Sequence, residues 1–377
     1  MIDFDNYDCF PKLAEALSNR TDKQPPSSCW EDLLGKTGIE RSLLFVLVDG
    51  MGECYINRLS PDSFLRDSKR KIIKSVFPST TASAMMSLAT TLPVAAHGIP
   101  GRYSYLKTDN LHLDSLAFRE RFSGKALSLE LSPKQLWPLP SFITESEITA
   151  FSVIPQVLLN SPFQSYLCGD RNVGGYSSIA DGVDLIINQI KYESSRTFNF
   201  FYLWDLDSLG HREGMHSSRM DELLILINTE LERLYDGLKS IADIVISADH
   251  GHIDAGEADI ITPDHKLMSF LETPPFGEPR AAQLQVKPER EKDFRAYFNE
   301  TFGDRFSLRP VKDSAALFGG RRLSKQASRS FANYIAIAET RNLLVYSQEH
   351  PAKTRINKAE HGGILPEERL IPLIIPK

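Results

Sequence analysis

Short, continuous apolar runs alternate along the chain with segments whose apolar residues recur every three or four positions. A continuous run is typical of a strand buried on both faces of a parallel sheet, and the three-to-four spacing is typical of a helix packed on that sheet. Strand-like runs occupy residues 42–48, 71–76, 148–155, 198–204, 241–248 and 370–375, with a further candidate at 164–168. Amphipathic helices are predicted over 179–190 and 220–238, the second capped at Ser217 or Ser218. This alternation predicts an α/β fold with a doubly wound, mostly parallel sheet and helices on both faces.

The pattern changes after about residue 254. A turn-rich segment at 274–279 is followed by a strand candidate at 282–286 and a helix candidate at 289–302, and an apolar run at 343–347 marks the return of the chain. We therefore expect a catalytic core made of residues 1–254 and 346–377, and a small inserted α+β cap at 255–345. Residues 103–145 show little periodicity and are predicted to be a loop-rich rim of a substrate site.

Composition narrows the function classes. The chain has 377 residues and a formal net charge of −6, which argues against specific nucleic-acid binding and against binding to an anionic membrane surface. An acidic protein can still act on phosphates where metal ions reverse the sign of the charge locally. No apolar run approaches the roughly 20 residues that span a bilayer, and the N-terminus lacks the pattern of a signal peptide. The cysteines are scattered without a CxxC pair, so we expect reduced thiols and a cytoplasmic location: Cys9, Cys29, Cys54 and Cys168. The oligomeric state stays open.

Acidic and imidazole side chains follow several of the predicted strands. Asp49 ends the first run, Asp207 and His211 follow the run at 198–204, and Asp249 and His250 follow the run at 241–248. The carboxyl ends of parallel strands share one edge of a sheet, where a late histidine, His361, could join them. Carboxylate and imidazole donors without thiolate suit Zn²⁺, Mn²⁺ or Fe, with Zn²⁺ the usual choice for hydrolysis. Two such clusters would hold two cations about 4 Å apart.

Other residues near these clusters compete for the same roles. Asp205 is the alternative to Asp207, and the i, i+4 relation to His211 favours Asp207. His252 is interpreted as a packed or hydrogen-bonding histidine and is not placed among the ligands. His97 precedes Gly98 and is interpreted as fixing a loop.

A hydroxyl cluster lies between the run at 71–76 and a helix that is predicted to extend to about Thr91. The start of a helix offers free N–H groups and a partial positive charge, which suit an anion. Ser and Thr also favour this place as helix caps. From this stretch alone a nucleophile and a cap are both open, with Thr80 and Thr81 as the candidates.

Taken together, these segments resemble the alkaline phosphatase superfamily and, within it, the type I phosphodiesterase/nucleotide pyrophosphatase family. The matching segments occur in family order: Leu47-Val48-Asp49-Gly50, Phe77-Pro78-Ser79-Thr80-Thr81, His97-Gly98-Ile99, Asp207-Ser208-Leu209-Gly210-His211, Ser247-Ala248-Asp249-His250-Gly251 and His361-Gly362-Gly363.

The resemblance implies a role for each matching position. Thr81 aligns with the nucleophile, in preference to Thr80, and would carry a covalent phospho-threonine. The resemblance implies two divalent cations per chain, Zn²⁺ above Mn²⁺ or Fe. One would be held by Asp49, Thr81, Asp249 and His250, and the other by Asp207, His211 and His361. The implied activity is hydrolysis of phosphodiester or pyrophosphate bonds in nucleotide-like or related small molecules.

One departure from the family pattern affects substrate choice. The family usually has an asparagine shortly after His-Gly-Ile, whereas this chain continues with Pro100-Gly101-Arg102. Arg102 could contact phosphate in a bidentate manner, or it could point to solvent while a backbone donor serves instead; Tyr103 is a candidate for stacking on a substrate. A phosphomonoesterase, phosphonate hydrolase or sulfatase is therefore the alternative. A catalytically silent phosphoester-binding protein is the alternative outside enzymes, although such a protein has no need of Thr81.

Overall fold

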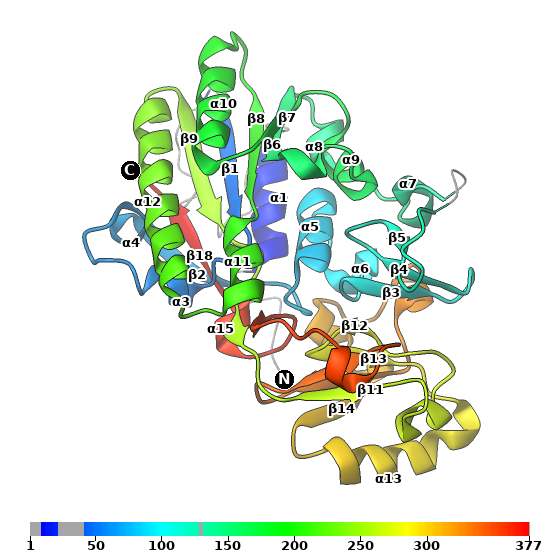
Figure 1. The fold of residues 1–377 in the computed structure, drawn as a ribbon. Coiled ribbons are helices and arrows are strands. Elements are labelled where there is room, and N and C mark those ends of the chain that lie inside the picture. Colours follow the sequence, from blue (N-terminus) through cyan, green and yellow to red (C-terminus); the bar gives the residue numbers. More distant parts are fainter. Residues whose placement is uncertain (1–8, 22–40, 128–130, 377) are drawn as a thin grey trace.

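The computed structural model describes residues 9–21, 41–127 and 131–376. Its centre is a seven-stranded sheet (Figure 1) in which all neighbouring strands are parallel except where β18 pairs with β2 and β9. The strands, in spatial order, are β2 (Lys69–Lys74), β18 (Leu370–Ile375), β9 (Ala242–Ser247), β1 (Ser42–Val48), β8 (Phe198–Leu203), β6 (Ala150–Pro155) and β7 (Val173–Tyr176). The predicted α/β fold with a mostly parallel sheet is confirmed.

Helices cover this sheet on both faces. The longer helices are α1 (Phe10–Thr21), α5 (Thr81–Thr90), α9 (Pro162–Cys168), α10 (Ile179–Tyr192), α11 (Asp205–Glu213), α12 (Ser218–Leu238) and α13 (Glu291–Phe302). Single-turn helices are α3 (Glu53–Ile56), α4 (Phe64–Asp67), α6 (Val94–His97), α7 (Pro133–Leu136), α8 (Phe142–Glu145), α14 (Ala327–Ser330) and α15 (Pro366–Arg369). Helix α12 is capped by Ser217, whose side chain accepts a hydrogen bond from the Met220 N–H, as the sequence predicts.

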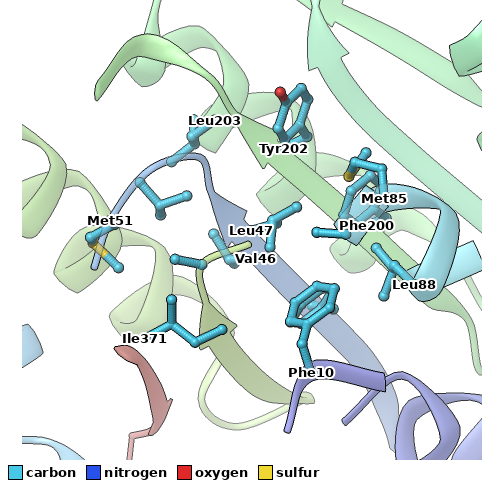
Figure 2. Close-up of a cluster of buried hydrophobic side chains, with 14 of the residues drawn as sticks. Phe10, Val46, Leu47, Met51, Met85, Leu88, Phe200, Tyr202, Leu203 and Ile371 are labelled. Carbon is cyan, nitrogen blue, oxygen red and sulfur yellow. The ribbon is translucent and has the colours of Figure 1, made fainter. Parts of the chain in front are cut away.

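Strand β8 shows why its sequence has no polar alternation. Phe200 and Tyr202 lie on the side of α5, close to Met85 and Leu88 (Figure 2). The residue between them, Phe201, contacts α10, where a Cβ added at Gly182 would lie 2.8 Å from its ring. Because helices cover both faces, every position of β8 is buried. Each large apolar side chain removed from water contributes roughly 1.5–3 kcal/mol.

A second seven-stranded sheet, which is antiparallel, lies beside the carboxyl ends of the first. Figure 1 shows it below the main sheet together with α13. Its strands, in spatial order, are β14 (Phe306–Pro310), β15 (Tyr334–Ala338), β13 (Ala281–Leu284), β12 (Phe276–Glu278), β3 (Tyr103–Leu106), β4 (Leu111–Asp114) and β5 (Arg119–Glu120). The first four strands come from the predicted insert, where Phe294 and Phe298 of α13 pack in a separate apolar cluster with Leu284. The boundaries of the insert at 255 and 345 stay a prediction.

Two local expectations were wrong, and a third holds in part. The stretch at 103–145 is loop-rich as expected, but it also contains β3, β4 and β5, which extend the sheet of the insert. Residues 164–168 belong to helix α9, which has Pro162 at its first turn, a position that favours helix initiation. Residues 205–211 were expected only to connect the strand at 198–204 to the helix at 220–238, but they belong to helix α11, whose early aspartates and late His211 suit the helix dipole.

Two further pairs of strands complete the fold. Strand β16 (Leu343–Tyr346) pairs in parallel with β11 (Ala258–Ile261). The expectation that the chain returns to the main sheet at 343–347 was therefore wrong. Strand β10 (Ile253–Asp254) pairs with β17 (Ala359–Glu360) and brings the late segment next to β9. Among the described residues, no helix has the length and apolar character needed to cross a membrane. Cys54 and Cys168 are free thiols, and Cys29 and residues 1–8 lie outside the described ranges.

Candidate active site

Four segments that are distant in the sequence meet at the carboxyl ends of the central strands. Asp49 follows β1, Asp249 and His250 follow β9, and Asp207 lies in the first turn of α11 after β8. His361 follows β17, which pairs with β10 directly after the Asp249 segment. The topology therefore brings together the side chains that the sequence singles out.

The first cluster consists of Asp49, Asp249 and His250, all of them buried. His250 Nε2 lies 3.3 Å from Asp49 Oδ1 and 3.4 Å from Asp249 Oδ2. Asp249 Oδ1 accepts hydrogen bonds from the Gly50 and His250 N–H groups, whereas the buried Asp249 Oδ2 has no hydrogen-bond partner. Burial, and then the charge of Asp49, raise the pKa of Asp249 to about 8. A buried carboxylate oxygen without a partner is costly, and a bound cation would satisfy it.

Thr81 lies at the edge of this cluster as the first residue of α5. Its Oγ1 lies 3.1 Å from His250 Nε2 and donates to Asp49 Oδ1 at 3.3 Å. The competing hydroxyl of Thr80 donates instead to Glu278 Oε1 at 2.7 Å. Thr80 occupies the N-cap position without a side-chain capping bond, so the hydroxyl cluster does not serve as the cap that its location allowed.

The second cluster consists of Asp207, His211 and His361. Asp207 Oδ1 lies 3.3 Å from His211 Nε2 and 3.8 Å from His361 Nε2. Although burial opposes ionisation, the imidazoles of His211 and His252 hold the pKa of Asp207 well below its usual value. This carboxylate is therefore ionised and suited to a cation.

The three histidines of the two clusters share one hydrogen-bond arrangement. The Nδ1 atoms of His211, His250 and His361 lie 2.8–3.1 Å from the carbonyl oxygens of Ala359, Gly251 and Ser79. A carbonyl only accepts, so each Nδ1 carries the proton and each Nε2 keeps its lone pair. Backbone acceptors commonly orient metal-binding histidines in this way.

His252 was missed as a member of the site. Its Nε2 lies 2.9 Å from Asp207 Oδ1, and it forms a possible ligand group with Asp207 and His250. The left-handed Gly50 (φ +73°) makes room for it, since a Cβ there would lie 2.2 Å from His252 Cε1. The only sequence feature that pointed to His252 was its position two residues after His250. Asp205, in contrast, accepts a hydrogen bond from Tyr176 and belongs to none of the three possible ligand groups found among the described residues.

Ligand atoms within each of these groups lie within 4.8 Å of one another. The lone pairs on Nε2, the ionised Asp207 and the unsatisfied Asp249 Oδ2 all suit divalent cations. The side chains present therefore fit a metal site of carboxylate and imidazole donors.

A cavity of about 980 Å³ opens over these clusters. Arg102 and Tyr103, the two residues predicted to contact a substrate, lie in its wall. The Arg102 guanidinium donates to Asp114 Oδ2 at 3.1 and 3.2 Å, so two of its five N–H donors are paired with a carboxylate, and its contact with a substrate stays a prediction. The Tyr103 ring lies 4.1 Å below the Arg121 guanidinium. Glu278, which no sequence motif singles out, also lines the cavity. Burial raises the pKa of Glu278, and hydrogen bonds from Arg102 N and Thr80 oppose that rise.

His97 fixes the loop before Arg102, as the sequence predicts. Its Nε2 lies 3.0 Å from Ser87 Oγ, and its Nδ1 accepts a hydrogen bond from Ile99 N at 3.2 Å. Because it is fully buried, the pKa of His97 falls to about 3.

Comparisons with known proteins support the geometry. The solved structure of human ectonucleotide pyrophosphatase/phosphodiesterase 5 aligns with 88% of this chain and 87% of its own, at 16% identity and a TM-score of 0.65. The murine counterpart, solved as an inactive variant in complex with AMP, aligns with 89% of this chain and 87% of its own, at 16% identity and a TM-score of 0.64. Phosphonoacetate hydrolase from Sinorhizobium meliloti, in complex with phosphonoacetate, aligns with 89% of this chain and 90% of its own, at 15% identity and a TM-score of 0.62. The comparison with curated proteins gives no match.

At these identities the solved structures show a shared fold. The family model described as type I phosphodiesterase / nucleotide pyrophosphatase matches residues 43–363, which include the strand ends and every side chain of both clusters. The chain therefore belongs to the type I phosphodiesterase/nucleotide pyrophosphatase family of the alkaline phosphatase superfamily, a family of metal-dependent phosphoester hydrolases.

Proposed function

We propose that this protein hydrolyses phosphodiester or pyrophosphate bonds of nucleotide-like small molecules through a covalent phospho-threonine on Thr81. The observation that carries the proposal is the position of the Thr81 hydroxyl, 3.1 Å from His250 Nε2 and 3.3 Å from Asp49 Oδ1. A hydroxyl at the start of a helix and among buried metal-type donors is suited to attack on a bound phosphate.

Two groups of side chains would hold two divalent cations. Asp49, Asp249 and His250, together with Thr81, would bind one, and the group of Asp207, His211 and His361 would bind the other. Cations bound there act as Lewis acids and make an oxygen nucleophile more acidic. We propose Zn²⁺, with Mn²⁺ or Fe as alternatives, because the donors are carboxylate and imidazole without thiolate.

The chain's own groups carry the bond changes. Thr81 Oγ1 forms a bond to phosphorus while the bond from phosphorus to the leaving oxygen breaks, and that oxygen departs with its electron pair. The Thr81 proton passes to Asp49 Oδ1, which accepts its hydrogen bond. The first N–H groups of α5 have no partner within the helix and are available to the phosphoryl oxygens. Water then attacks phosphorus and the bond to Thr81 Oγ1 breaks. Asp49 returns its proton to Thr81 Oγ1, and the proton that the attacking water loses passes through solvent to the oxygen that left in the first step.

The comparisons support the choice of substrate class. The murine structure, described as inactive with a threonine-to-alanine substitution, contains AMP, which favours a nucleotide-like substrate. The phosphonoacetate complex favours the alternative of a phosphonate substrate for the same machinery.

Replacing Thr81 with alanine tests the proposal. Purified wild type and Thr81→Ala would be assayed with bis-p-nitrophenyl phosphate and p-nitrophenyl phosphate, and their metal content measured by mass spectrometry. We expect a loss of at least about 10³-fold in kcat with cation content near that of the wild type, since both clusters keep their side chains.

Thr80→Ala is the matched control, because it removes the neighbouring hydroxyl and should leave turnover measurable. Full activity in Thr81→Ala would reject the nucleophile assignment. A wild type that binds both cations but hydrolyses no phosphoester or phosphonate would instead support a catalytically silent binding protein.

A further inference from the structure

A carboxylate from the insert reaches the loop that carries the nucleophile. Glu278, the last residue of β12, accepts hydrogen bonds at Oε1 from Thr80 Oγ1 at 2.7 Å and from Arg102 N at 2.5 Å. It is 6% exposed and lines the same cavity as Thr81. Because Thr80 directly precedes Thr81, this carboxylate lies beside the place where a phosphoryl group would bind.

The other oxygen of Glu278 is left to the cavity. Both hydrogen bonds end on Oε1, and Oε2 accepts none from the described residues. Oε2 is not a fully buried atom, so it is exposed to the cavity that Glu278 lines.

Two glycines hold the carboxylate in a narrow slot. A Cβ at Gly101 (φ +149°) would lie 3.0 Å from Glu278 Cγ, and a Cβ at Gly362 (φ +103°) would lie 2.7 Å from Glu278 Cβ. Gly362 follows His361, so the slot joins the insert, the Arg102 loop and the second cluster. The position of the charge is therefore set by the backbone on both sides.

The nearby guanidiniums of Arg102 and Arg121 attract this carboxylate only at a distance and do not pair with it directly. The Arg102 guanidinium is paired with Asp114, and the Arg121 guanidinium stacks on Tyr103 and donates to the Pro275 carbonyl at 2.7 Å. Among the described residues Glu278 forms no ion pair. An unpaired carboxylate at a cavity wall repels anions, and more strongly so the greater their charge.

We infer that Glu278 is a specificity-determining residue that disfavours dianionic phosphomonoesters relative to monoanionic phosphodiesters. The inference rests on the proposed function. It assigns the preference for diesters to a residue of the insert, where the sequence suggested that Arg102 would favour more highly charged substrates.

The test is the ratio of kcat/KM for bis-p-nitrophenyl phosphate to kcat/KM for p-nitrophenyl phosphate at pH 8, where the monoester is a dianion. Glu278→Gln keeps an oxygen for both hydrogen bonds and removes the charge. We expect the ratio to fall roughly tenfold, equivalent to about 1.4 kcal/mol, mainly because the monoester reacts faster. Glu278→Asp keeps the charge, and Glu272→Gln makes the same change at an exposed position of the insert, so both should keep the wild-type ratio.

A purely structural role for Glu278 predicts a different result. In that case Glu278→Gln would slow both esters equally or change neither, and an unchanged ratio would overturn the inference. Should Glu278→Gln not fold, Glu278→Ser removes the charge with a smaller side chain and gives the same test.

A wild type that hydrolyses neither ester would reject the proposed function and still leave the inference testable. Calorimetric titration of the metal-loaded proteins with inorganic phosphate at pH 8 then decides it. About tenfold tighter binding by Glu278→Gln than by wild type would support repulsion, and equal affinities would overturn it.

Discussion

A buried ion pair between Arg280 and Glu368 connects the insert to the loop that carries His361. Both side chains are fully buried, and Arg280 donates from Nε to Glu368 Oε1 at 2.6 Å and from Nη2 to Oε2 at 2.9 Å. Glu368 Oε1 also accepts from Gly363 N at 2.7 Å, two residues after His361. Arg280 Nη1 donates to the carbonyls of Thr340 and Asn342. Every charge in this network is therefore compensated.

Glu368→Gln would remove the negative charge and leave the Arg280 guanidinium buried without a counter-charge. Breaking a buried pair in this way costs about 3–5 kcal/mol, because the remaining charge keeps its desolvation penalty. Replacing both partners, as in Arg280→Met with Glu368→Leu, should cost much less than the sum of the two single changes, since no unpaired charge remains. Because Gly363 is held by Glu368, we also expect the single variant to bind the second cation more weakly.

Urea unfolding of metal-free protein in a chelator, followed by circular dichroism, measures this effect without a contribution from cation binding. The matched control is Asp184→Asn, which breaks the pair of Arg233 and Asp184, whose side chains are 42% and 63% exposed. That surface pair should contribute no more than about 1 kcal/mol. The reasoning is refuted if Glu368→Gln loses no more stability than the control, or if the double variant is as unstable as the two single changes added together.

Two further predictions concern the loops around the site. Burial lowers the pKa of His97 to about 3, so the unfolded chain binds a proton at this histidine at pH values where the folded protein does not. The free energy of unfolding is therefore unaffected by His97 above about pH 6.5, and it falls by up to about 1.4 kcal/mol per pH unit as the pH drops toward 3. His97→Gln should make the thermal midpoint less dependent on pH between 7 and 5, and an unchanged slope would contradict this account. Gly50→Ala should destabilise the protein by at least about 1–2 kcal/mol and displace His252, because Gly50 is left-handed and lies against that ring. Wild-type stability and cation affinity in Gly50→Ala would show that this packing is unimportant.

Much of the fold and of the candidate site could be predicted from local patterns. A strand such as β1 is buried on both faces, so its seven residues read as one apolar run, and Asp49 at its end stands out. The same reasoning identified Asp249, His250 and Asp207, because the ends of parallel strands share one edge. The change of pattern between a strand and a helix marked the hydroxyl cluster with Thr80 and Thr81, and the resemblance to the family selected Thr81.

Tertiary structure alone decided the partners of the remaining groups. The sequence makes Arg102 a candidate phosphate contact, and only the structure shows that its guanidinium pairs with Asp114, a residue of strand β4. Glu278 has no local sequence signature. It lies 176 residues from Arg102 in the chain, and it reaches the site because the pairing of β12 with β3 brings it into hydrogen-bond contact with Arg102 N. His252 likewise acquired a role only through its contact with Asp207.

The physical reason for this division is the range of the forces involved. Hydrophobic periodicity and strand termination are properties of neighbouring residues, so the sequence by itself determined most strands of the central sheet, the helices α10 and α12, and the acidic and imidazole side chains along the edge of the sheet. Charge pairing and the choice among competing hydrogen-bond partners depend on groups that only folding brings within a few ångströms. The pairing of Arg102 with Asp114 and the hydrogen bonds that hold Glu278 at the cavity wall were therefore decided by the tertiary structure.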